Sequence, residues 1–213
     1  MGNSQVKTAA EVAVELIETE PPLKVGILGG TFNPPHLGHL VIAEQVKETL
    51  QLDKILFLPT AEPPHSHKKT TIDAVHRINM LRMSIQGNDD FIIDLLEVEQ
   101  GGKNYTVDTV RTLQQLYPTV EFYFIIGADM VEDLKNWHRV DELLELIPFI
   151  AVRREGYSME TEYPLITVTV PQIDISSSEI RKMVQAGQSI RYLVNEDVRF
   201  YIEQERLYQD GDN

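Results

Sequence analysis

The sequence contains no cysteine in its 213 residues. Disulfide bonds and thiolate metal sites are therefore excluded, and a reducing cytoplasm is the simplest predicted location. Long hydrophobic runs are also absent, since no apolar stretch approaches the roughly 20 residues that a membrane-spanning helix requires. Glutamates from Glu11 to Glu20 interrupt the segment where a secretory signal would need an apolar region. We therefore expect neither a signal peptide nor a membrane partner.

Positive charge is scarce: 19 lysines and arginines stand against 33 aspartates and glutamates, for a formal net charge of −14. Proteins that bind nucleic acid normally carry a basic face, so no nucleic-acid partner is expected. The net charge does not exclude a site for a small anion. Distant charges are screened over about 8–10 Å, and the field at a site depends on the groups nearest to it.

Short apolar segments alternate with helical patterns along the chain. This alternation predicts an α/β fold with a doubly wound, mainly parallel sheet, followed by C-terminal helices. The predicted strands are 24–28, 54–58, 91–98, 120–126, 149–152 and 165–170. The predicted helices are 39–50, 72–85, 107–116, a pair within 130–147, 177–186 and 195–207.

One domain is predicted over residues 24–208, because no internal repeat or linker interrupts this stretch. Residues 1–23 form an N-terminal extension with an apolar stripe at helical spacing that ends at Pro21 and Pro22. We interpret it as a peripheral helix or a frayed extension, and a helix that binds a partner is the alternative. Residues 209–213 form a short tail.

The segment "GGTFNPPHLGHL", residues 29–40, follows the first predicted strand directly. In an open parallel sheet, ligands bind beyond the carboxyl ends of the strands. Gly29 and Gly30 permit close approach of the backbone, and the helix start that follows attracts anions. His36 and His39, three residues apart, are expected to project from one side of this helix start. Together these features predict a site for phosphate oxygens.

Other interpretations of this segment are weaker. Its glycines do not fit the G-x-G-x-x-G pattern of dinucleotide binding, and no lysine stands where a P-loop requires one. A zinc site would need a further ligand nearby, and none is present. A purely structural role for two histidines in a tight turn stays open.

"GGTFNPPHLGH" resembles the H-x-G-H signature of the nucleotidyltransferase superfamily, in the form used by pyridine-nucleotide adenylyltransferases. A second segment, "ISSSEIR" at residues 175–181, is similar to the I-S-S-[ST]-x-[IL]-R motif of the same enzymes. Its serines stand where a helix should begin, and Arg181 supplies a fixed fork of donors for phosphate. Alone, this segment would be typical of a serine cap followed by a solvated arginine.

The resemblance implies a Rossmann-like nucleotidyltransferase fold and a reaction in NAD biosynthesis. In that reaction AMP passes from ATP to nicotinate mononucleotide, giving deamido-NAD and pyrophosphate, with Mg²⁺ carried by ATP and no metal site on the protein. The implied catalytic residues are His36, His39 and Arg181. Those assigned to ATP are Gly29, Gly30, Thr31, Phe32, Gly127, Asp129, Ser177 and Ser178. Those assigned to the mononucleotide are Asn33, Tyr105, Thr106, Trp137 and Lys68.

In the nicotinate-specific branch of the family, an aromatic ring stacks on the pyridine while backbone amides hold the carboxylate. By resemblance, Trp137 would supply the ring and the Tyr105–Thr106 pair the amides. The alternatives are core packing for Trp137 and, for Asp129, a helix cap.

Residues 59–70 form a predicted polar loop in which the family often has P-P-H-K. Here Lys68 and Lys69 both follow that position, so Lys69 is an alternative to Lys68. His65 and His67 have the spacing of a metal pair, although an exposed loop segment is the simpler interpretation. Arg77 either braces this loop or is solvated at the surface.

A phosphomonoester is already largely ionised near pH 7, because its second pKa is about 6. The reaction therefore needs no general base; it needs alignment of two anions and stabilisation of the departing pyrophosphate. Nicotinamide mononucleotide is the alternative substrate. A non-catalytic nucleotide sensor is the alternative from another class. Whether the chain forms a homo-oligomer is open.

Overall fold

The computed structural model describes residues 22–61, 71–153, 159–171 and 173–209. In these residues six strands form one parallel sheet in the order β3-β2-β1-β4-β5-β6. The strands are β1 (Lys24–Gly30), β2 (Lys54–Pro59), β3 (Phe91–Ile93), β4 (Glu121–Gly127), β5 (Phe149–Arg153) and β6 (Leu165–Thr169). The predicted doubly wound α/β architecture is confirmed. The strand order reverses between β1 and β4, which is where such folds bind ligands.

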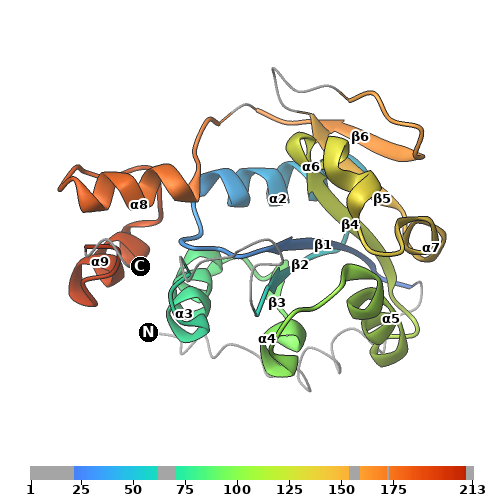
Figure 1. Ribbon diagram of the computed structural model, residues 1–213, viewed down its shortest axis with the longest axis horizontal. Coiled ribbons are helices and arrows are strands. Elements are labelled where there is room, and N and C mark those ends of the chain that lie inside the picture. Colours follow the sequence, from blue (N-terminus) through green and yellow to red (C-terminus); the bar gives the residue numbers. More distant parts are fainter. Residues whose placement is uncertain (1–21, 62–70, 154–158, 172, 210–213) are drawn as a thin grey trace.

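The helices cover both faces of the sheet, and Figure 1 shows α2 and α5 on opposite sides of it. They are α2 (Leu37–Leu50), α3 (Ala74–Ile85), α4 (Leu96–Gln100), α5 (Thr106–Leu116), α6 (Ala128–Asp133), α7 (Val140–Leu146), α8 (Ser177–Gln185) and α9 (Glu196–Gln204). A 3₁₀ turn, η1 (Leu134–Asn136), joins α6 to the segment before α7. No helix in the described part of the chain is long and apolar enough to cross a membrane.

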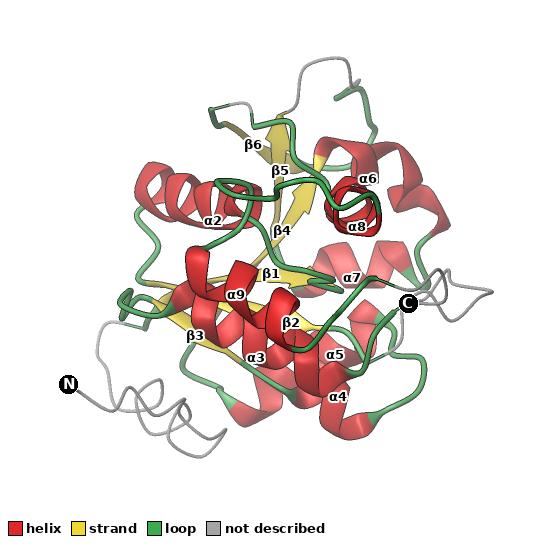
Figure 2. Cartoon of the chain, turned by 90° about the vertical axis from the view of Figure 1, so that its left-hand side faces the viewer, coloured by secondary structure: helices red, strands yellow, loops and turns green. Residues whose placement is uncertain are grey.

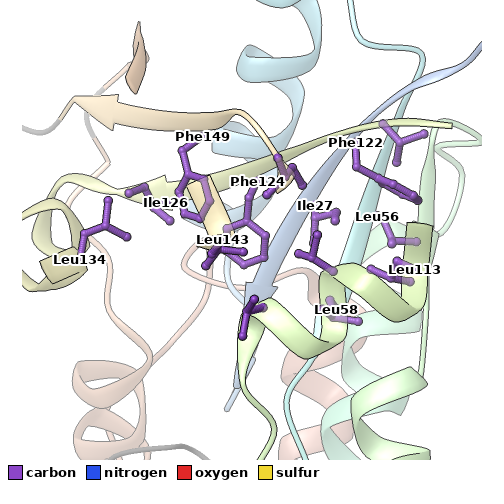
Figure 3. Packing of buried hydrophobic residues seen from close by; sticks show 14 of the residues in the cluster. Ile27, Leu56, Leu58, Leu113, Phe122, Phe124, Ile126, Leu134, Leu143 and Phe149 are labelled. Carbon is purple, nitrogen blue, oxygen red and sulfur yellow. The ribbon is translucent and has the colours of Figure 1, made fainter. Parts of the chain in front are cut away.

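Alternation of side chains along each strand divides the core into two clusters, one on each face. On one face, Ile27 and Phe124 pack with Leu113 of α5 and Leu143 of α7 (Figure 3). On the other face, residues such as Leu28, Ile55 and Ile125 pack with Ala43 and Val46 of α2. Burial on both faces explains why the strands have nearly continuous apolar sequences.

A third cluster joins the C-terminal helices to α3. It contains Met80 of α3, Ile180 of α8, Ile202 of α9 and Tyr208 beyond α9. Figure 2 shows α9 lying against α3, and Figure 1 places α8 and α9 at the same end of the molecule as α3. This packing returns the end of the chain to the neighbourhood of the first loop.

The predicted strand 91–98 is wrong in its second half. The strand ends at Ile93, and Leu96–Gln100 forms helix α4. Asp94 explains the change, because its carboxylate accepts a hydrogen bond of 2.8 Å from the backbone N–H of Leu96 and turns the chain. Elsewhere β1 runs on to Gly30, and α2 begins at Leu37 rather than at residue 39.

Candidate functional site

The first loop, residues 31–36, lies at the point where the strand order reverses. It connects the end of β1 at Gly30 to the start of α2 at Leu37. Neighbouring β4 is parallel to β1 and ends at Gly127, directly before α6. The pairing of Leu28 with Ile125 places the two glycine-bearing strand ends, which are predicted to face ATP, on neighbouring strands at the carboxyl end of the sheet.

The two histidines form a stacked pair at the start of α2. Their ring centroids are 3.7 Å apart and the ring planes differ by 25°. The backbone N–H of His36 donates to Nδ1 of His39 at 3.1 Å. Since Nδ1 of His39 accepts, the proton of its neutral ring lies on Nε2, which is then a hydrogen-bond donor.

The space at Gly38 explains why a glycine stands between these histidines. A Cβ atom at this position would lie 3.0 Å from Nδ1 and 3.1 Å from Cε1 of His36. Any side chain at this position would therefore crowd the His36 imidazole, and the ring would have to shift by a few tenths of an ångström. The H-x-G-H spacing thus serves the packing of the pair.

His39 is neutral near pH 7 in the free protein. Burial holds the pKa of His39 well below its ordinary value, and the adjacent His36 ring lowers it further. Phe32 contributes to this burial, because its ring packs edge-on against His39 at 5.1 Å. Phe32 is itself buried, so its side chain belongs to the core beneath the site.

The serine–arginine motif packs directly on the first loop. Ser177 Oγ donates to the carbonyl of Pro34 at 2.8 Å, across 143 residues of sequence. Arg181 Nη1 donates to the carbonyl of Asn33 at 2.8 Å, and its Nη2 donates to Ser178 Oγ at 3.3 Å. Ser176 is the N-cap of α8, accepting from the N–H of Glu179. The two motifs from opposite ends of the chain therefore share one surface.

At the end of β4, Asp129 folds back over Gly127. A Cβ atom at Gly127 would collide with the carboxylate of Asp129, which would then have to turn away. Both residues lie at the carboxyl end of β4, the strand next to β1, and the resemblance places ATP at this end of the sheet.

The predicted pyridine residues lie on a neighbouring loop pair. The Tyr105 ring, before α5, contacts the His138 ring at 4.1 Å, which joins the Tyr105–Thr106 segment to the Trp137–His138 segment. Trp137 is half-buried and packs edge-on against Phe124 and Phe149, each at 6.0 Å. Core packing therefore accounts for part of the indole. Lys68, together with His65, His67 and Lys69, lies outside the described residues.

Comparison with known proteins identifies the family. A cytidylyltransferase-like family model matches residues 27–183. A protein of Geobacillus thermodenitrificans named "Probable nicotinate-nucleotide adenylyltransferase" is 55% identical over 185 residues, covering 87% of this chain and 86% of its own. A protein of Lactiplantibacillus plantarum with the same name is 46% identical over 206 residues, covering 97% of this chain and 98% of its own. The chain belongs to the nicotinate-nucleotide adenylyltransferase family. It is a nucleotidyltransferase.

Solved structures agree in fold. The nicotinic acid mononucleotide adenylyltransferase of Plasmodium falciparum, in a structure described as complexed with NaAD, superposes with a TM-score of 0.77. Its sequence is 22% identical, and the match covers 90% of this chain and 98% of that chain. The nucleotidyltransferase fold implied by the resemblance is thereby confirmed.

The sequence did not identify two residues that hold the first loop. Arg77 is buried, and it donates to the carbonyls of Thr31 at 2.8 Å, Ala61 at 3.1 Å and Ile72 at 3.3 Å. It therefore braces the first loop and both flanks of the 62–70 segment, and the alternative of a solvated surface residue is wrong. Tyr208 reaches the same loop from the C-terminal end. No local pattern around Tyr208 signals this contact.

Proposed function

We propose that this enzyme transfers AMP from ATP to nicotinate mononucleotide through the site formed by the first loop and α8. The observation that carries the proposal is the pair of contacts from Ser177 and Arg181 to the carbonyls of Pro34 and Asn33. These contacts bring a guanidinium and serine hydroxyls to the loop that presents the histidine pair. The products are deamido-NAD and pyrophosphate, as in NAD biosynthesis.

In the proposed reaction, an oxygen of the mononucleotide phosphate attacks the α-phosphorus of ATP. A new P–O bond forms as the bond between the α-phosphorus and the α–β bridging oxygen breaks, and pyrophosphate leaves with the electron pair. The attacking phosphate is already ionised at pH 7, its second pKa being about 6, so no protein base has to remove a proton. The protein's task is to align two anions and to stabilise the charge on the leaving group.

The roles of the site residues follow from their chemistry. His39, neutral in the free enzyme, offers Nε2–H as a donor to phosphate oxygen, and the approaching anion favours protonation of the ring. Arg181 supplies a permanent positive charge and Ser177 and Ser178 supply hydroxyls. Gly29, Gly30, Gly127 and Asp129 line the ATP side. ATP is proposed to arrive with Mg²⁺ on its phosphate oxygens, which suit this hard cation.

The mononucleotide is proposed to lie toward α5. Tyr105 and Thr106 stand at the start of an 11-residue helix whose first N–H groups suit a carboxylate. Trp137 is only half-buried, so part of the indole remains available to stack on a pyridine. Asn33 and Lys68 complete the set, Asn33 from within the first loop.

The proposal extends to the organisation and location of the chain. Residues 24–208 form the nucleotidyltransferase domain, with 1–23 as an extension and 209–213 as a tail. The absence of cysteine supports a cytoplasmic location.

The deciding experiment is a pyrophosphate-release assay with ATP and either nicotinate or nicotinamide mononucleotide, with the dinucleotide identified by chromatography. We expect turnover with a higher kcat/KM for the nicotinate form, because the helix start favours a carboxylate over a neutral amide. Equal kcat/KM values in competition would refute this preference. ATP binding without pyrophosphate release would identify a sensor and refute the enzyme.

A further inference from the structure

A buried hydroxyl outside both motifs contacts the first loop. Tyr208 lies just beyond α9 and is 1% exposed. Its hydroxyl donates to Oδ1 of Asn33 at 2.8 Å, across 175 residues of sequence. Asn33 is also buried, at 4% exposure, and its backbone carbonyl accepts from Arg181. Asn33 is therefore held from two sides by residues near the C-terminus.

The backbone is strained near both ends of this hydrogen bond. Tyr208 has φ of 62°, and Phe32, directly before Asn33, has φ of 51°. Bulky residues rarely adopt this left-handed region, and they do so where the surrounding structure over-determines the conformation. Such strained positions cluster at ligand sites. Here the hydrogen bond from Tyr208 to Asn33 joins the two strained positions, since Asn33 directly follows Phe32.

The hydroxyl stays protonated at all working pH values, so it is a constant donor. Burial raises the pKa of Tyr208, and the nearby guanidinium groups of Arg181 and Arg77 only partly oppose this. Arg181 has a different fate under the proposed function, because a bound phosphate competes with the Asn33 carbonyl for its N–H groups. The bond from Tyr208 goes to the side chain of Asn33 and does not involve Arg181.

We propose that Tyr208 is a positioning residue for adenylyl transfer. Its hydroxyl holds Asn33, and through Asn33 the loop that leads into the histidine pair, in the geometry that aligns the phosphates. This role rests on the proposed function, since it concerns the same loop. It adds to that function a residue that belongs to neither motif.

The matched test compares Tyr208→Phe with Tyr201→Phe. Both substitutions keep the ring and remove one hydroxyl from the same C-terminal cluster. The Tyr201 hydroxyl pairs with Nδ1 of His76 at 2.9 Å and accepts from Nδ2 of Asn79 at 3.1 Å, so its partners are on α3 and not in the first loop. Loss of one such bond corresponds to about tenfold in rate when it acts on the transition state.

For Tyr208→Phe we expect kcat with ATP and nicotinate mononucleotide to fall about tenfold, with a smaller change in KM. For Tyr201→Phe we expect kcat within about twofold of the wild type, although both variants lower Tm. A purely structural role for Tyr208 would move Tm in both variants and kcat in neither. Unchanged kcat in Tyr208→Phe would overturn the positioning role.

A double-mutant cycle tests whether the effect passes through Asn33. Once Asn33→Ala has removed the acceptor, adding Tyr208→Phe should lower kcat by less than about twofold more. Fully additive losses would overturn the route through Asn33. The cycle is needed because Asn33 is also assigned to the mononucleotide, so Asn33→Ala alone would lower kcat whether or not Tyr208 acts through it.

The two hypotheses fail in distinguishable ways. A wild-type enzyme that forms no pyrophosphate would refute the proposed function. The role of Tyr208 would then be read from ATP affinity by calorimetry, where Tyr208→Phe should bind more weakly than Tyr201→Phe and equal affinities would overturn it. An active wild type with a fully active Tyr208→Phe variant would refute the positioning role alone.

Discussion

The chemistry of the site depends on two imidazoles whose environment differs from that of free histidine. His36 and His39 stack at 3.7 Å, so protonation of both rings would place two positive charges in contact. Burial adds a further penalty on the charged form of His39. In the proposed reaction an approaching phosphate would favour protonation of His39, because a nearby anion stabilises the charged ring.

Replacing His39 by alanine should lower kcat/KM about 10²–10³-fold, the usual cost of losing one donor to developing negative charge. His76→Ala is the control, because His76 lies on α3 and pairs with Tyr201 rather than with the first loop. Steady-state pyrophosphate release measures both variants. Near-wild-type kcat/KM in His39→Ala would remove His39 from the catalytic set.

The lowered pKa of His39 also predicts a pH dependence of stability. Above its ordinary pKa of 6.5, both folded and unfolded states hold the ring neutral, and its contribution to stability is complete. Below 6.5 the unfolded chain binds a proton that the folded state refuses, so the free energy of unfolding falls as the pH drops toward the lower folded pKa. Denaturant unfolding at several pH values should show a larger loss on acidification in the wild type than in His39→Asn. Equal losses would contradict the lowered pKa.

At the scale of elements, the first loop is held through its backbone carbonyls. Arg77 of α3 binds the carbonyl of Thr31, while Arg181 and Ser177 of α8 bind those of Asn33 and Pro34. The contacts come from two helices that also pack together with α9 in the third cluster. The loop is therefore ordered before ligand binds, which reduces the entropic cost of aligning the phosphates.

Replacing Arg77 by methionine should remove this brace. The substitution keeps much of the buried volume and leaves three backbone carbonyls without the guanidinium, so we expect a loss of roughly 3 kcal/mol in the free energy of unfolding. We expect kcat/KM to fall as well, because the Thr31 carbonyl belongs to the first loop. Arg82→Met, on the same helix, is the control. Denaturant unfolding and pyrophosphate release then separate the two variants, and equal behaviour would argue against the brace.

Sequence patterns predict the helices and strands well where the apolar pattern extends over many residues, and less well where the segment is short. The alternation of strands and helices was sufficient for the parallel sheet. Residues 95–98 are too few to show a period, and the turn at Asp94 depends on one hydrogen bond. Asn33 was predicted as a ligand residue, but its link to Tyr208 was not, because local periodicity carries no information about a partner 175 residues away. For Arg77 the sequence allows either a brace for the 59–70 loop or a solvated side chain, because it does not show the three carbonyls to which Arg77 donates.

At the scale of the whole molecule, the C-terminal part of the chain packs on the loop that follows the first strand. The sheet starts at Lys24, and α8, α9 and Tyr208 close over the loop that follows β1. The carbonyl of Leu193, between α8 and α9, also accepts from the N–H of Leu37 at the start of α2 at 2.9 Å. The first loop and the C-terminal helices are therefore packed together, and catalysis should depend on the contacts between them.

The N-terminal extension is proposed to take no part in catalysis, and this proposal can be tested by deletion. The assigned site residues begin at Gly29, and the first strand begins at Lys24, whose backbone N–H donates to Asp53 at 2.7 Å. Removing residues 1–20 leaves both the strand and its first contacts intact. We expect kcat/KM for pyrophosphate release to stay within about twofold of the full chain, since no group that aligns or stabilises the phosphates is lost. A loss of tenfold or more would assign the extension a part in catalysis and contradict the division at residue 23.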